Sequence, residues 1–517
     1  MTFEIVFVLL SLLGMMAALI ADKMRPGMVL FSVVVLFLCV GILTPKEMLE
    51  GFSNKGMITV ALLFLVSEGI RQSGTLGQVI KKLLPQGKTT VFKAQLRILP
   101  SVAFISAFLN NTPVVVIFAP IIKHWAKSVK LPATKFLIPL SYVTILGGIC
   151  TLIGTSTNLV VHGMILEAGY EGFTMFELGK VGIFIAIAGI IYLFIFSKRL
   201  LPDARPDTAV PDEEIEEGEK FHRVEAVLGA RFPGINKKLK DFNFQRHYGA
   251  EVKEIKTRNG QRFVTNLDDV VLHEGDTLVV MADDTFIPTW GESSVFVLLT
   301  NGNEPDTSGK KKRWFALLLL VLMIVGATVG ELPVTKEMFP DIKLDMFFFV
   351  SITTIIMAWT NLFPARKYTK YISWDILITI ACAFAISKAM VNSGVADSVA
   401  KFIIGLSDDY GPHVLLAMVF IITNLFTELI TNNAAAALAF PLALSISAQL
   451  GVSPTPFFVV ICMAASASFS TPIGYQTNLI VQGIGNYKFT DFVRIGLPLN
   501  IITFLISVIL IPLIWNF

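Results

Sequence analysis

The stretch TLIGTSTNLV (Thr151–Val160) returns as TPIGYQTNLI (Thr471–Ile480), 320 residues further along the chain and identical at six of ten positions. Each copy interrupts an apolar run with Gly, Ser, Thr and Asn. Within one residue, the same spacing relates Asn111 to Asn432. The chain therefore contains an internal repeat, and each copy of the repeat carries polar breaks within apolar segments.

The composition divides the chain into two apolar blocks and one charged segment. Of its 517 residues 54% are hydrophobic and only 16% are charged, whereas soluble domains have about 25% charged residues. Almost half of the 42 basic and 39 acidic residues lie between Lys198 and Arg313. This pattern excludes a soluble enzyme, a nucleic-acid binder and a disordered protein. It indicates two membrane blocks that flank a water-soluble insert, and the net charge of +3 adds nothing about partners.

Apolar runs long enough, or nearly long enough, to cross a bilayer occur in both blocks. They cover 3–21, 27–43, 57–72, 134–166 and 174–197, then 314–331, 343–360, 373–391, 455–485 and 491–514. The first run lacks a basic leader and a cleavage site, so we expect a span rather than a signal peptide. We predict these domains: repeat 1 over 1–197, linker 198–220, insert 221–299, linker 300–313 and repeat 2 over 314–517.

Two further apolar stretches, 90–122 and 411–447, are interrupted at Asn110-Asn111-Thr112 and at Thr431-Asn432-Asn433. If both are re-entrant hairpins, nearly all basic loops lie on the side of the insert, as the positive-inside rule requires. The insert (198–313) is then cytosolic and both termini lie outside the cytoplasmic membrane. Each copy then has five spans, so the second copy is inverted. Inverted repeats with paired broken helices indicate a secondary transporter whose site lies at the midplane.

The residues at the breaks suit the binding of ions. Non-helical backbone within a membrane is tolerated where it lines a wet cavity or is buried in protein, and there it offers carbonyl and hydroxyl oxygens to cations. Helix N-termini offer amides to anions. None of the four breaks contains Lys or Arg, so an anion would need amides, hydroxyls and a co-bound cation. The alternative, that these Asn and Thr residues only join helices, suits one isolated break better than four breaks in symmetric pairs.

The two tips resemble the Ser-Asn-Thr signatures of the divalent anion:sodium symporter family, which belongs to a larger group with citrate and arsenite carriers. Each tip keeps the central Asn and departs at one or both flanks. Ser470–Gly474 and Thr427-Glu428 also resemble family motifs. The resemblance covers both membrane blocks and implies an elevator-type homodimer, in which a mobile domain carries both hairpins past a scaffold.

The resemblance also implies binding residues. One sodium site would use Ser106, Asn111 and backbone near Gly154, and the other Thr427, Asn432 and backbone near Ser470. The anion would contact residues of both tips and of the second break, namely Asn110, Asn111, Thr112, Thr431, Asn432, Asn433, Thr471 and Pro472.

Three ionisable residues in or near the spans require a separate explanation, because intramembrane charge is costly. Glu68 and Lys388 occupy equivalent positions of the two repeats, and we expect both to be structural residues near an interface. Glu428 follows a predicted sodium ligand, and supporting the hairpin or taking part in coupling are both open. The four cysteines, which lie in apolar runs, are predicted to be small buried residues: Cys39, Cys150, Cys382 and Cys462.

The insert is predicted to be a small α+β domain with strands at Arg223–Val227, Glu251–Ile255, Leu278–Met281 and Val295–Leu299, and with a helix starting near Asn236. Its pattern over 234–278 resembles a TrkA C-terminal (RCK-C) domain. That resemblance implies a regulatory or dimerising module with a small ligand, for which cyclic di-AMP is one candidate by family analogy. His247 and His273 could be ligands, although surface or packing positions are the simpler expectation.

The sequence therefore predicts a sodium-coupled symporter for a sulfate-like or dicarboxylate anion, embedded in lipid, without a cofactor and without nucleic acid as partner. An arsenite-type exporter or antiporter on the same scaffold is the first alternative. An RCK-gated potassium transporter is a weaker one, because no run like a Thr-Val-Gly-Tyr-Gly filter is present. We expect no enzyme, since the spans contain neither paired Asp residues nor a His/Glu metal cluster.

Overall fold

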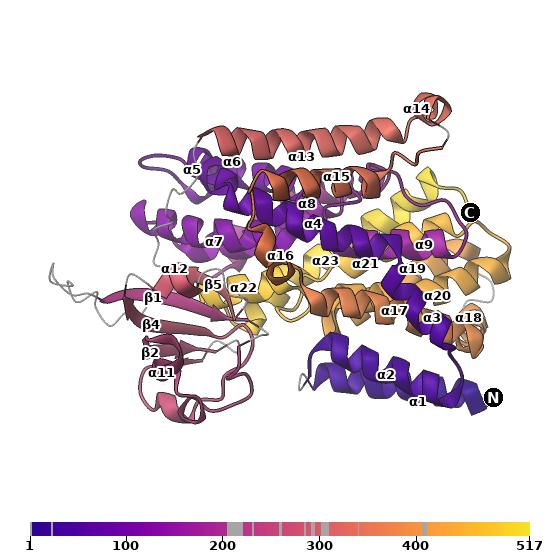
Figure 1. Cartoon of the computed structure of the whole chain (residues 1–517), viewed down its shortest axis with the longest axis horizontal. Coiled ribbons are helices and arrows are strands. Elements are labelled where there is room, and N and C mark those ends of the chain that lie inside the picture. The colour runs from indigo at the N-terminus through magenta and orange to yellow at the C-terminus, as the bar shows by residue number, and fades with distance from the viewer. Residues whose placement is uncertain are drawn as a thin grey trace.

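The computed structural model describes residues 3–21, 24–203, 221–229, 232–257, 261–283, 286–290, 295–300, 310–339, 341–405 and 411–517. A large helical block carries a small β-sheet at one end, and both termini lie at the opposite end of the block (Figure 1). This arrangement agrees with termini and insert on opposite sides of a membrane. Which side faces the cytosol stays a prediction.

The helices of the first block are α1 (Phe3–Ile20), α2 (Pro26–Val40), α3 (Pro45–Glu50), α4 (Lys55–Gln72), α5 (Thr75–Leu83), α6 (Val91–Ser106), α7 (Asn111–Ser128), α8 (Leu137–Gly148), α9 (Ser156–Glu167) and α10 (Gly179–Leu200). Those of the second block are α13 (Lys310–Gly330), α14 (Pro333–Met338), α15 (Met346–Trp359), α16 (Tyr368–Tyr371), α17 (Trp374–Asn392), α18 (Val395–Gly405), α19 (Gly411–Leu429), α20 (Asn432–Leu450), α21 (Thr455–Ser466), α22 (Gln476–Gly485) and α23 (Phe489–Ile514).

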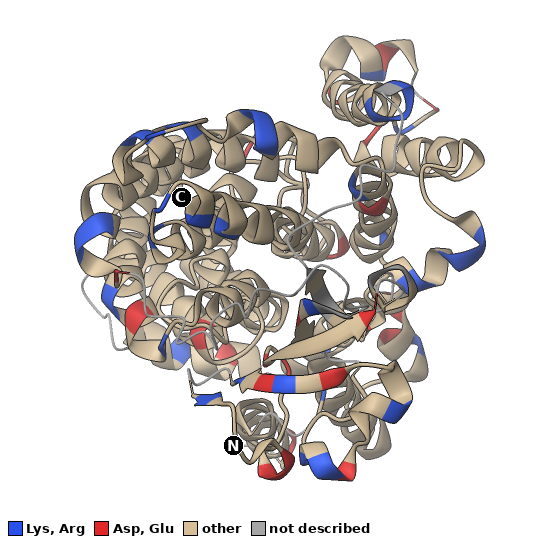
Figure 2. Ribbon diagram, turned by 90° about the vertical axis from the view of Figure 1, so that its left-hand side faces the viewer, with Lys and Arg blue, Asp and Glu red and all other residues tan. Residues whose placement is uncertain are grey.

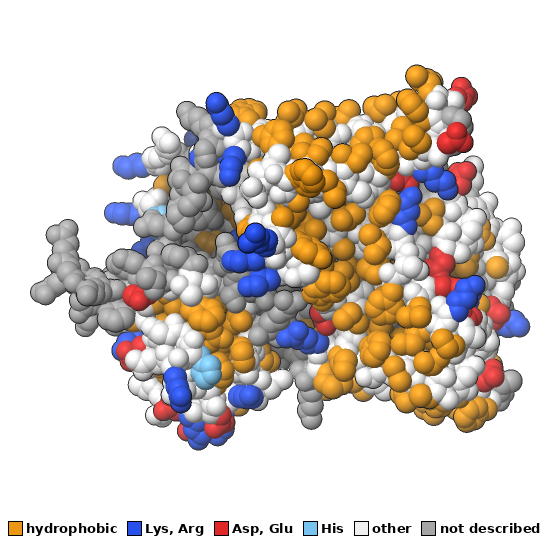
Figure 3. Space-filling view, viewed as in Figure 1, with side chains coloured by type: hydrophobic (Ala, Val, Ile, Leu, Met, Phe, Trp, Pro, Cys, Tyr) orange, Lys and Arg blue, Asp and Glu red, His pale blue; other side chains and the backbone are white. Residues whose placement is uncertain are grey.

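Eight helices in the described parts of the chain are long and apolar enough to cross a membrane, so the chain is a multi-span membrane protein. Large apolar side chains are exposed at helical spacing, for example Ile183, Ile187 and Ile191 on α10. Such faces suit lipid rather than water. In the space-filling view they form a broad band between the charged insert and the charged far end (Figure 3).

The predicted interruptions are confirmed as helix breaks. The stretch 90–122 is divided into α6 and α7, and 411–447 into α19 and α20, with the second helix beginning at Asn111 and at Asn432. The stretches 134–166 and 455–485 are each two helices, broken over 149–155 and 467–475. Re-entry of the hairpins and inversion of the second copy stay predictions.

The helices pack in two groups. Helices α6 to α10 pack with α19 to α23, whereas α1, α2, α4, α13, α15, α17 and α18 pack with one another. The groups meet where α20 contacts α17 and α18 and where α9 contacts α4. At that boundary α20 is rich in alanine, and most of its residues are buried. Small side chains allow helices to approach closely, so the hairpin helix α20 lies at the centre of the block.

The insert is an α+β unit, as predicted. Its five-stranded antiparallel sheet has the order β3-β2-β4-β1-β5. The strands are β1 (Phe221–Leu228), β2 (Glu251–Lys256), β3 (Arg262–Phe263), β4 (Thr277–Asp283) and β5 (Phe296–Thr300), with short helices α11 (Phe244–Tyr248) and α12 (Phe286–Trp290). The four predicted strands are present, and β3 was not predicted because two residues give no periodic signal. The predicted helix start near Asn236 is a 3-10 turn, Leu239–Asp241, followed by α11.

The insert rests on helices that bear a hairpin or a break. Glu225 of β1 accepts hydrogen bonds from Lys123 of α7, at 3.0 and 2.9 Å. Gly275, which precedes β4, has a φ of +84°, and a Cβ there would lie 2.6 Å from the Leu479 side chain of α22. Viewed from this end, Lys and Arg lie at helix ends around the sheet (Figure 2).

Two sequence predictions about single residues need comment. Cys382 and Cys462 are buried, but Cys150 is only half-buried and Cys39 is exposed. The prediction of burial was therefore wrong for Cys39, because an apolar run does not reveal which helix face meets lipid. All four thiols are free.

The Arg71 guanidinium pairs with the Glu68 carboxylate at 2.7 Å, which fits the expected structural role of Glu68. Lys388 is exposed. The backbone carbonyl of Asn243 lies 2.7 Å from Nδ1 of His247, whose ring stacks on Phe242. This is the packing position expected for His247.

Candidate functional site

Each hairpin tip is closed by the same side-chain pair. Ser106 Oγ donates to Asn111 Oδ1 over 2.7 Å, and Thr427 Oγ1 donates to Asn432 Oδ1 over 2.9 Å. In both cases a hydroxyl on the last turns of the first helix reaches the first residue of the second helix. Asn111 is fully buried. The two repeats thus share the same hydrogen bond at their tips. This bond brings together the side chains that were predicted as sodium ligands.

The breaks are held by their own repeated bonds. In the first break, the Gly154 N–H donates to Thr151 Oγ1 over 3.2 Å and Asn158 Nδ2 donates to the Thr151 carbonyl over 2.9 Å. The second break contains the same two bonds among the equivalent residues Thr471, Gly474 and Asn478, at 3.2 and 3.1 Å. The repeated Thr, Gly and Asn therefore replace helical hydrogen bonds where the helix is interrupted, which is the requirement for broken helices in a membrane.

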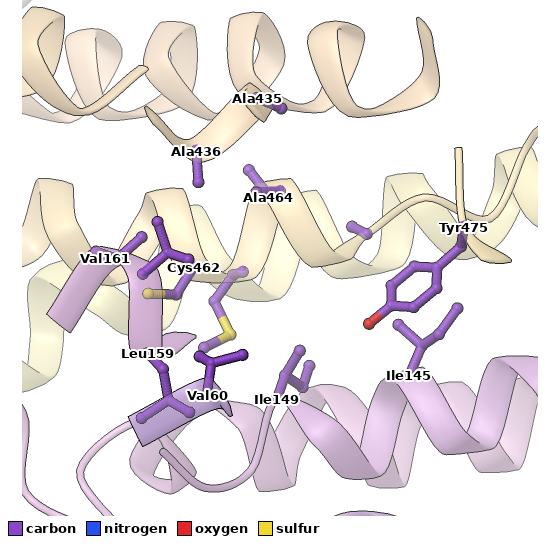
Figure 4. Packing of buried hydrophobic residues seen from close by; sticks show 14 of the residues in the cluster. Val60, Ile145, Ile149, Leu159, Val161, Ala435, Ala436, Cys462, Ala464 and Tyr475 are labelled. Carbon is purple, nitrogen blue, oxygen red and sulfur yellow. The ribbon is translucent and has the colours of Figure 1, made fainter. Parts of the chain in front are cut away.

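The first tip contacts the second break. Asn111 Nδ2 donates to the Tyr475 hydroxyl over 2.6 Å, and Thr112 Oγ1 donates to Gln476 Oε1 over 3.2 Å. Thr155 Oγ1 of the first break lies 3.1 Å from the same Tyr475 hydroxyl. Figure 4 shows the Tyr475 ring beside Ile145 at one edge of a buried apolar layer.

The second tip contacts the start of α9, directly after the first break. Asn433 Oδ1 accepts from Ser156 Oγ over 3.3 Å and from Thr157 Oγ1 over 3.2 Å. Interruptions more than 270 residues apart in sequence thus meet at one place. Each tip is held by the break of the other repeat.

Four helix N-termini converge here, at Asn111, Ser156, Asn432 and Gln476. A helix N-terminus carries unpaired amides and a partial positive charge, which favours anions. The tips and breaks supply hydroxyl, amide and carbonyl oxygens for cations, and they contain no Lys or Arg. The arrangement can hold a small anion together with cations, without fixed positive side chains.

The first predicted sodium set is compact. A Cβ on Gly154 would lie 2.5 Å from the Gly148 carbonyl oxygen, and a Cβ on Gly148 would lie 2.8 Å from Asn111 Oδ1. Only glycine permits this approach. The backbone of the first break therefore lies against the amide of the first tip, beside Ser106.

The second predicted set is divided. Thr427 Oγ1 lies 2.9 Å from Asn432 Oδ1 and 2.6 Å from the Ala465 carbonyl oxygen, so these two acceptors share its single proton. Ser468, rather than Ser470, lies next to this pair, and its Oγ donates to the Thr427 carbonyl over 3.3 Å. Ser470 lies instead beside Glu428, whose Oε1 accepts from its N–H over 2.9 Å.

The other predicted substrate residues lie around the same place. Asn110 lines a small cavity with Ser156, Thr471 Oγ1 donates to the Glu428 carbonyl over 3.2 Å, and Pro472 is buried within the second break. In the described part of the chain Thr431 Oγ1 is buried without a hydrogen-bond partner.

Sequence reasoning did not select Tyr475, Gln476, Ser156 and Thr157, which make the contacts between the repeats. The signal was present, because Tyr475 and Gln476 align with Thr155 and Ser156 at the repeat spacing of 320. All four are polar positions inside apolar stretches, within three residues after Gly154 or Gly474.

Comparison with known proteins identifies the family. The model of the citrate transporter family (CitMHS) matches residues 16–448 and 342–517. An uncharacterized transporter of Synechocystis is 30% identical over 94% of this chain and 93% of its own length. An uncharacterized transporter of Escherichia coli is 25% identical over 99% of this chain and 100% of its own length. Sodium/sulfate cotransporter 2 of Chlamydomonas reinhardtii is 31% identical over 54% of this chain and 31% of its own length.

Relatives across the whole length, together with helix breaks that meet at one place, mark the chain as a transporter and not an enzyme. The chain belongs to the citrate transporter family of secondary transporters, related to the divalent anion:sodium symporters.

Proposed function

We propose that this chain is a sodium-coupled symporter that carries a small divalent anion, sulfate-like or dicarboxylate, across the cytoplasmic membrane. The observation that carries the proposal is the meeting of four helix N-termini without any Lys or Arg. Amides at these termini would hold the anion, and bound sodium would neutralise it. The relatives named as sodium/sulfate cotransporters support sulfate and sodium, and the matched citrate transporter family keeps carboxylates as candidates.

The anion would lie between the two tips and the second break. Its proposed ligands are Asn110, Asn111, Thr112, Thr431, Asn432, Asn433, Thr471 and Pro472. One sodium ion would bind at Ser106, Asn111 and Gly154. The other would bind at Thr427 and Asn432, where the position of Ser468 supports it as a further ligand in place of Ser470.

Transport would proceed by an elevator movement. The hairpin-bearing group, α6 to α10 with α19 to α23, would move as one body past the other group, which would hold the homodimer together. The hydrogen bonds between tips and breaks lie within the moving group, so they would persist through the movement. The repeats, 1–197 and 314–517, would be inverted relative to each other.

The insert, 221–299, would be a TrkA C-terminal-like regulatory domain on the cytosolic side, joined to the repeats by linkers 198–220 and 300–313. Its contacts with α7 and α22 support a regulatory role. A small ligand bound to it would act directly on helices that carry a tip and a break.

The test is uptake of radiolabelled sulfate and, separately, succinate into proteoliposomes, with and without an inward sodium gradient. We expect sodium-dependent uptake of one of them, and no sodium-dependent uptake of either would refute the symporter. Asn111→Ala and Asn432→Ala should each abolish coupled uptake while leaving a folded, membrane-inserted dimer. Losing one such buried partner costs about 1–3 kcal/mol per binding event, roughly 5- to 150-fold in affinity.

The matched control is Asn392→Ala, because Asn392 Nδ2 donates to the Ile42 carbonyl over 3.1 Å, in the other group of helices. Its uptake should equal that of the wild type. Normal uptake by the Asn111 and Asn432 variants would overturn the site assignment.

A further inference from the structure

A cavity of about 790 Å³ lies between the insert and the starts of α2 and α17. In Figure 1, α1 runs from the far end of the membrane block towards the insert, so α2 begins at the end of the block that bears the insert. The cavity therefore lies where the apolar block meets the charged insert. Its volume is within the range of small-molecule sites, about 300–1,000 Å³. Its described lining includes no residue of the tips or breaks, so it is separate from the transport site.

The side of the cavity that belongs to the membrane block is apolar. It is lined by Met24, Met28, Phe31, Phe52, Trp374 and Ile378. Met24, Met28 and Trp374 are 51%, 57% and 46% exposed. Large apolar side chains that gather at an exposed place mark a contact with a ligand, a protein or lipid. Tryptophan is also enriched where a membrane meets water. This wall suits the acyl chain of a lipid.

The opposite side of the cavity is polar and belongs to the insert. It is lined chiefly by Asn236, His273 and Glu274. The loops that carry these residues are joined by backbone bonds, because the Asn236 N–H donates to the Leu272 carbonyl over 2.7 Å. Gly275, directly after Glu274, lies against the Leu479 side chain of α22. The polar wall is thus held both within the insert and against the membrane block.

Charges of both signs line the cavity. Arg25 directly precedes α2, and Asp375 lies in the first turn of α17. The Asp375 carboxylate lies against the first turn of α2, because a Cβ on Gly27 would be 2.8 Å from its Oδ1. With Glu274, the described lining holds one guanidinium and two carboxylates. A purely anionic ligand would meet the carboxylates and a purely cationic one the guanidinium. The lining therefore complements a head group that carries both a phosphate and an ammonium.

We propose that this cavity binds a phospholipid with an ethanolamine head group, from the leaflet on the side of the insert. The phosphate would pair with the Arg25 guanidinium, and the ammonium would donate hydrogen bonds to the carboxylates of Glu274 and Asp375. The acyl chains would lie along the apolar wall. A choline head group cannot donate such bonds and a glycerol head group has no cation, so lipids with either should bind more weakly. The proposal goes beyond the proposed function and does not depend on the transported ions.

The test is native mass spectrometry of the purified full-length protein in detergent, titrated with dioleoylphosphatidylethanolamine. We expect one lipid per chain, bound about tenfold more tightly than dioleoylphosphatidylcholine or dioleoylphosphatidylglycerol, which have the same chains. Glu274→Gln, on the insert, and Arg25→Gln, on the membrane block, should each weaken this binding about tenfold. The control is Glu251→Gln, because Glu251 pairs with Lys253 on the exposed surface of the insert and does not line the cavity.

Equal affinity for the three lipids would overturn the proposal. So would wild-type affinity for dioleoylphosphatidylethanolamine in both Glu274→Gln and Arg25→Gln. A third arm adds free phosphoethanolamine, which is the head group without its chains. Displacement of the lipid by an equal concentration of phosphoethanolamine would also overturn the proposal, because the apolar wall would then contribute nothing to binding.

Discussion

One ion-paired, partly exposed carboxylate helps to attach the insert to the helices of the membrane block, and it gives a quantitative prediction. The carboxylate of Glu225 on β1 pairs with two ammonium groups. Its oxygens lie 2.9 Å from Nζ of Lys123 on α7 and 3.4 Å from Nζ of Lys256 on β2. The Lys256 side chain is only 4% exposed, and that of Glu225 is 18% exposed. Glu225→Gln keeps the shape of the side chain but removes the carboxylate that pairs with Lys123 and one of the two carboxylates near Lys256, whose ammonium also lies 4.0 Å from Glu254.

The magnitude follows from the pKa of Glu225. Burial alone raises this pKa, but the ammonium groups of Lys123 and Lys256 outweigh burial and lower it from 4.5 to about 2. Each pKa unit corresponds to about 1.4 kcal/mol, so the ion pairs favour the folded, docked insert by about 3 kcal/mol. Because the Glu225 side chain is partly exposed and solvent screens the pairs, we expect a loss of about 2–3 kcal/mol in the variant.

The sign of the pH dependence follows as well. A lowered pKa stabilises the folded state fully above the unfolded value of 4.5. That stabilisation is lost as the pH falls from 4.5 towards about 2. The attachment of the wild-type insert should therefore weaken over this acidic range by the contribution of Glu225, and Glu225→Gln should lack this component of the pH dependence.

The assay is hydrogen–deuterium exchange of the full-length protein, read at β1 and at the Lys123 end of α7. A loss of 2–3 kcal/mol should accelerate exchange there roughly 30- to 150-fold. Asp269→Asn is the control, because Asp269 pairs with Lys238 and Lys240 on the exposed surface of the insert, and it should change nothing measurable. Equal exchange in the wild type and Glu225→Gln would refute the reasoning.

Two further predictions concern the membrane block. Tyr475→Phe removes the hydroxyl that accepts a hydrogen bond from Asn111. It should weaken binding by about 1 kcal/mol and raise the half-saturating sodium or anion concentration about fivefold. Unchanged uptake kinetics would contradict this. Gly496→Ala would place a Cβ 2.0 Å from the Phe469 carbonyl oxygen, so it should abolish monodisperse protein on size-exclusion chromatography. Gly405→Ala should not, because a Cβ there would have no atom of the described residues within 4 Å. A monodisperse Gly496→Ala protein would show that α23 can move away from the break.

The helix breaks could be predicted from sequence because they depend on local chemistry. Gly, Ser, Thr and Asn inside an apolar run mark backbone that needs other hydrogen-bond partners, and the repeat at a spacing of 320 strengthens that signal. The same holds for the insert, whose charge and strand alternation are local. The closure of each tip, Ser106 to Asn111 and Thr427 to Asn432, also follows from positions five residues apart.

The contacts between the repeats could not be predicted in this way. Nothing near Asn111 in sequence indicates that its amide reaches Tyr475, because that bond depends on how α7 packs against α22. The same reason separates Ser470 from the tip and places it with Glu428 and Asn500. The burial of single residues could not be predicted from the sequence either, as the exposed Cys39 shows.

The sequence by itself determined that this is a two-block membrane protein with a charged insert and four polar helix breaks, because polarity and periodicity are local properties of a chain. Only the tertiary structure decided which break meets which tip and which oxygens remain without partners. Those facts depend on packing between segments more than 270 residues apart, and a hydrogen bond requires an approach that no spacing along the chain specifies.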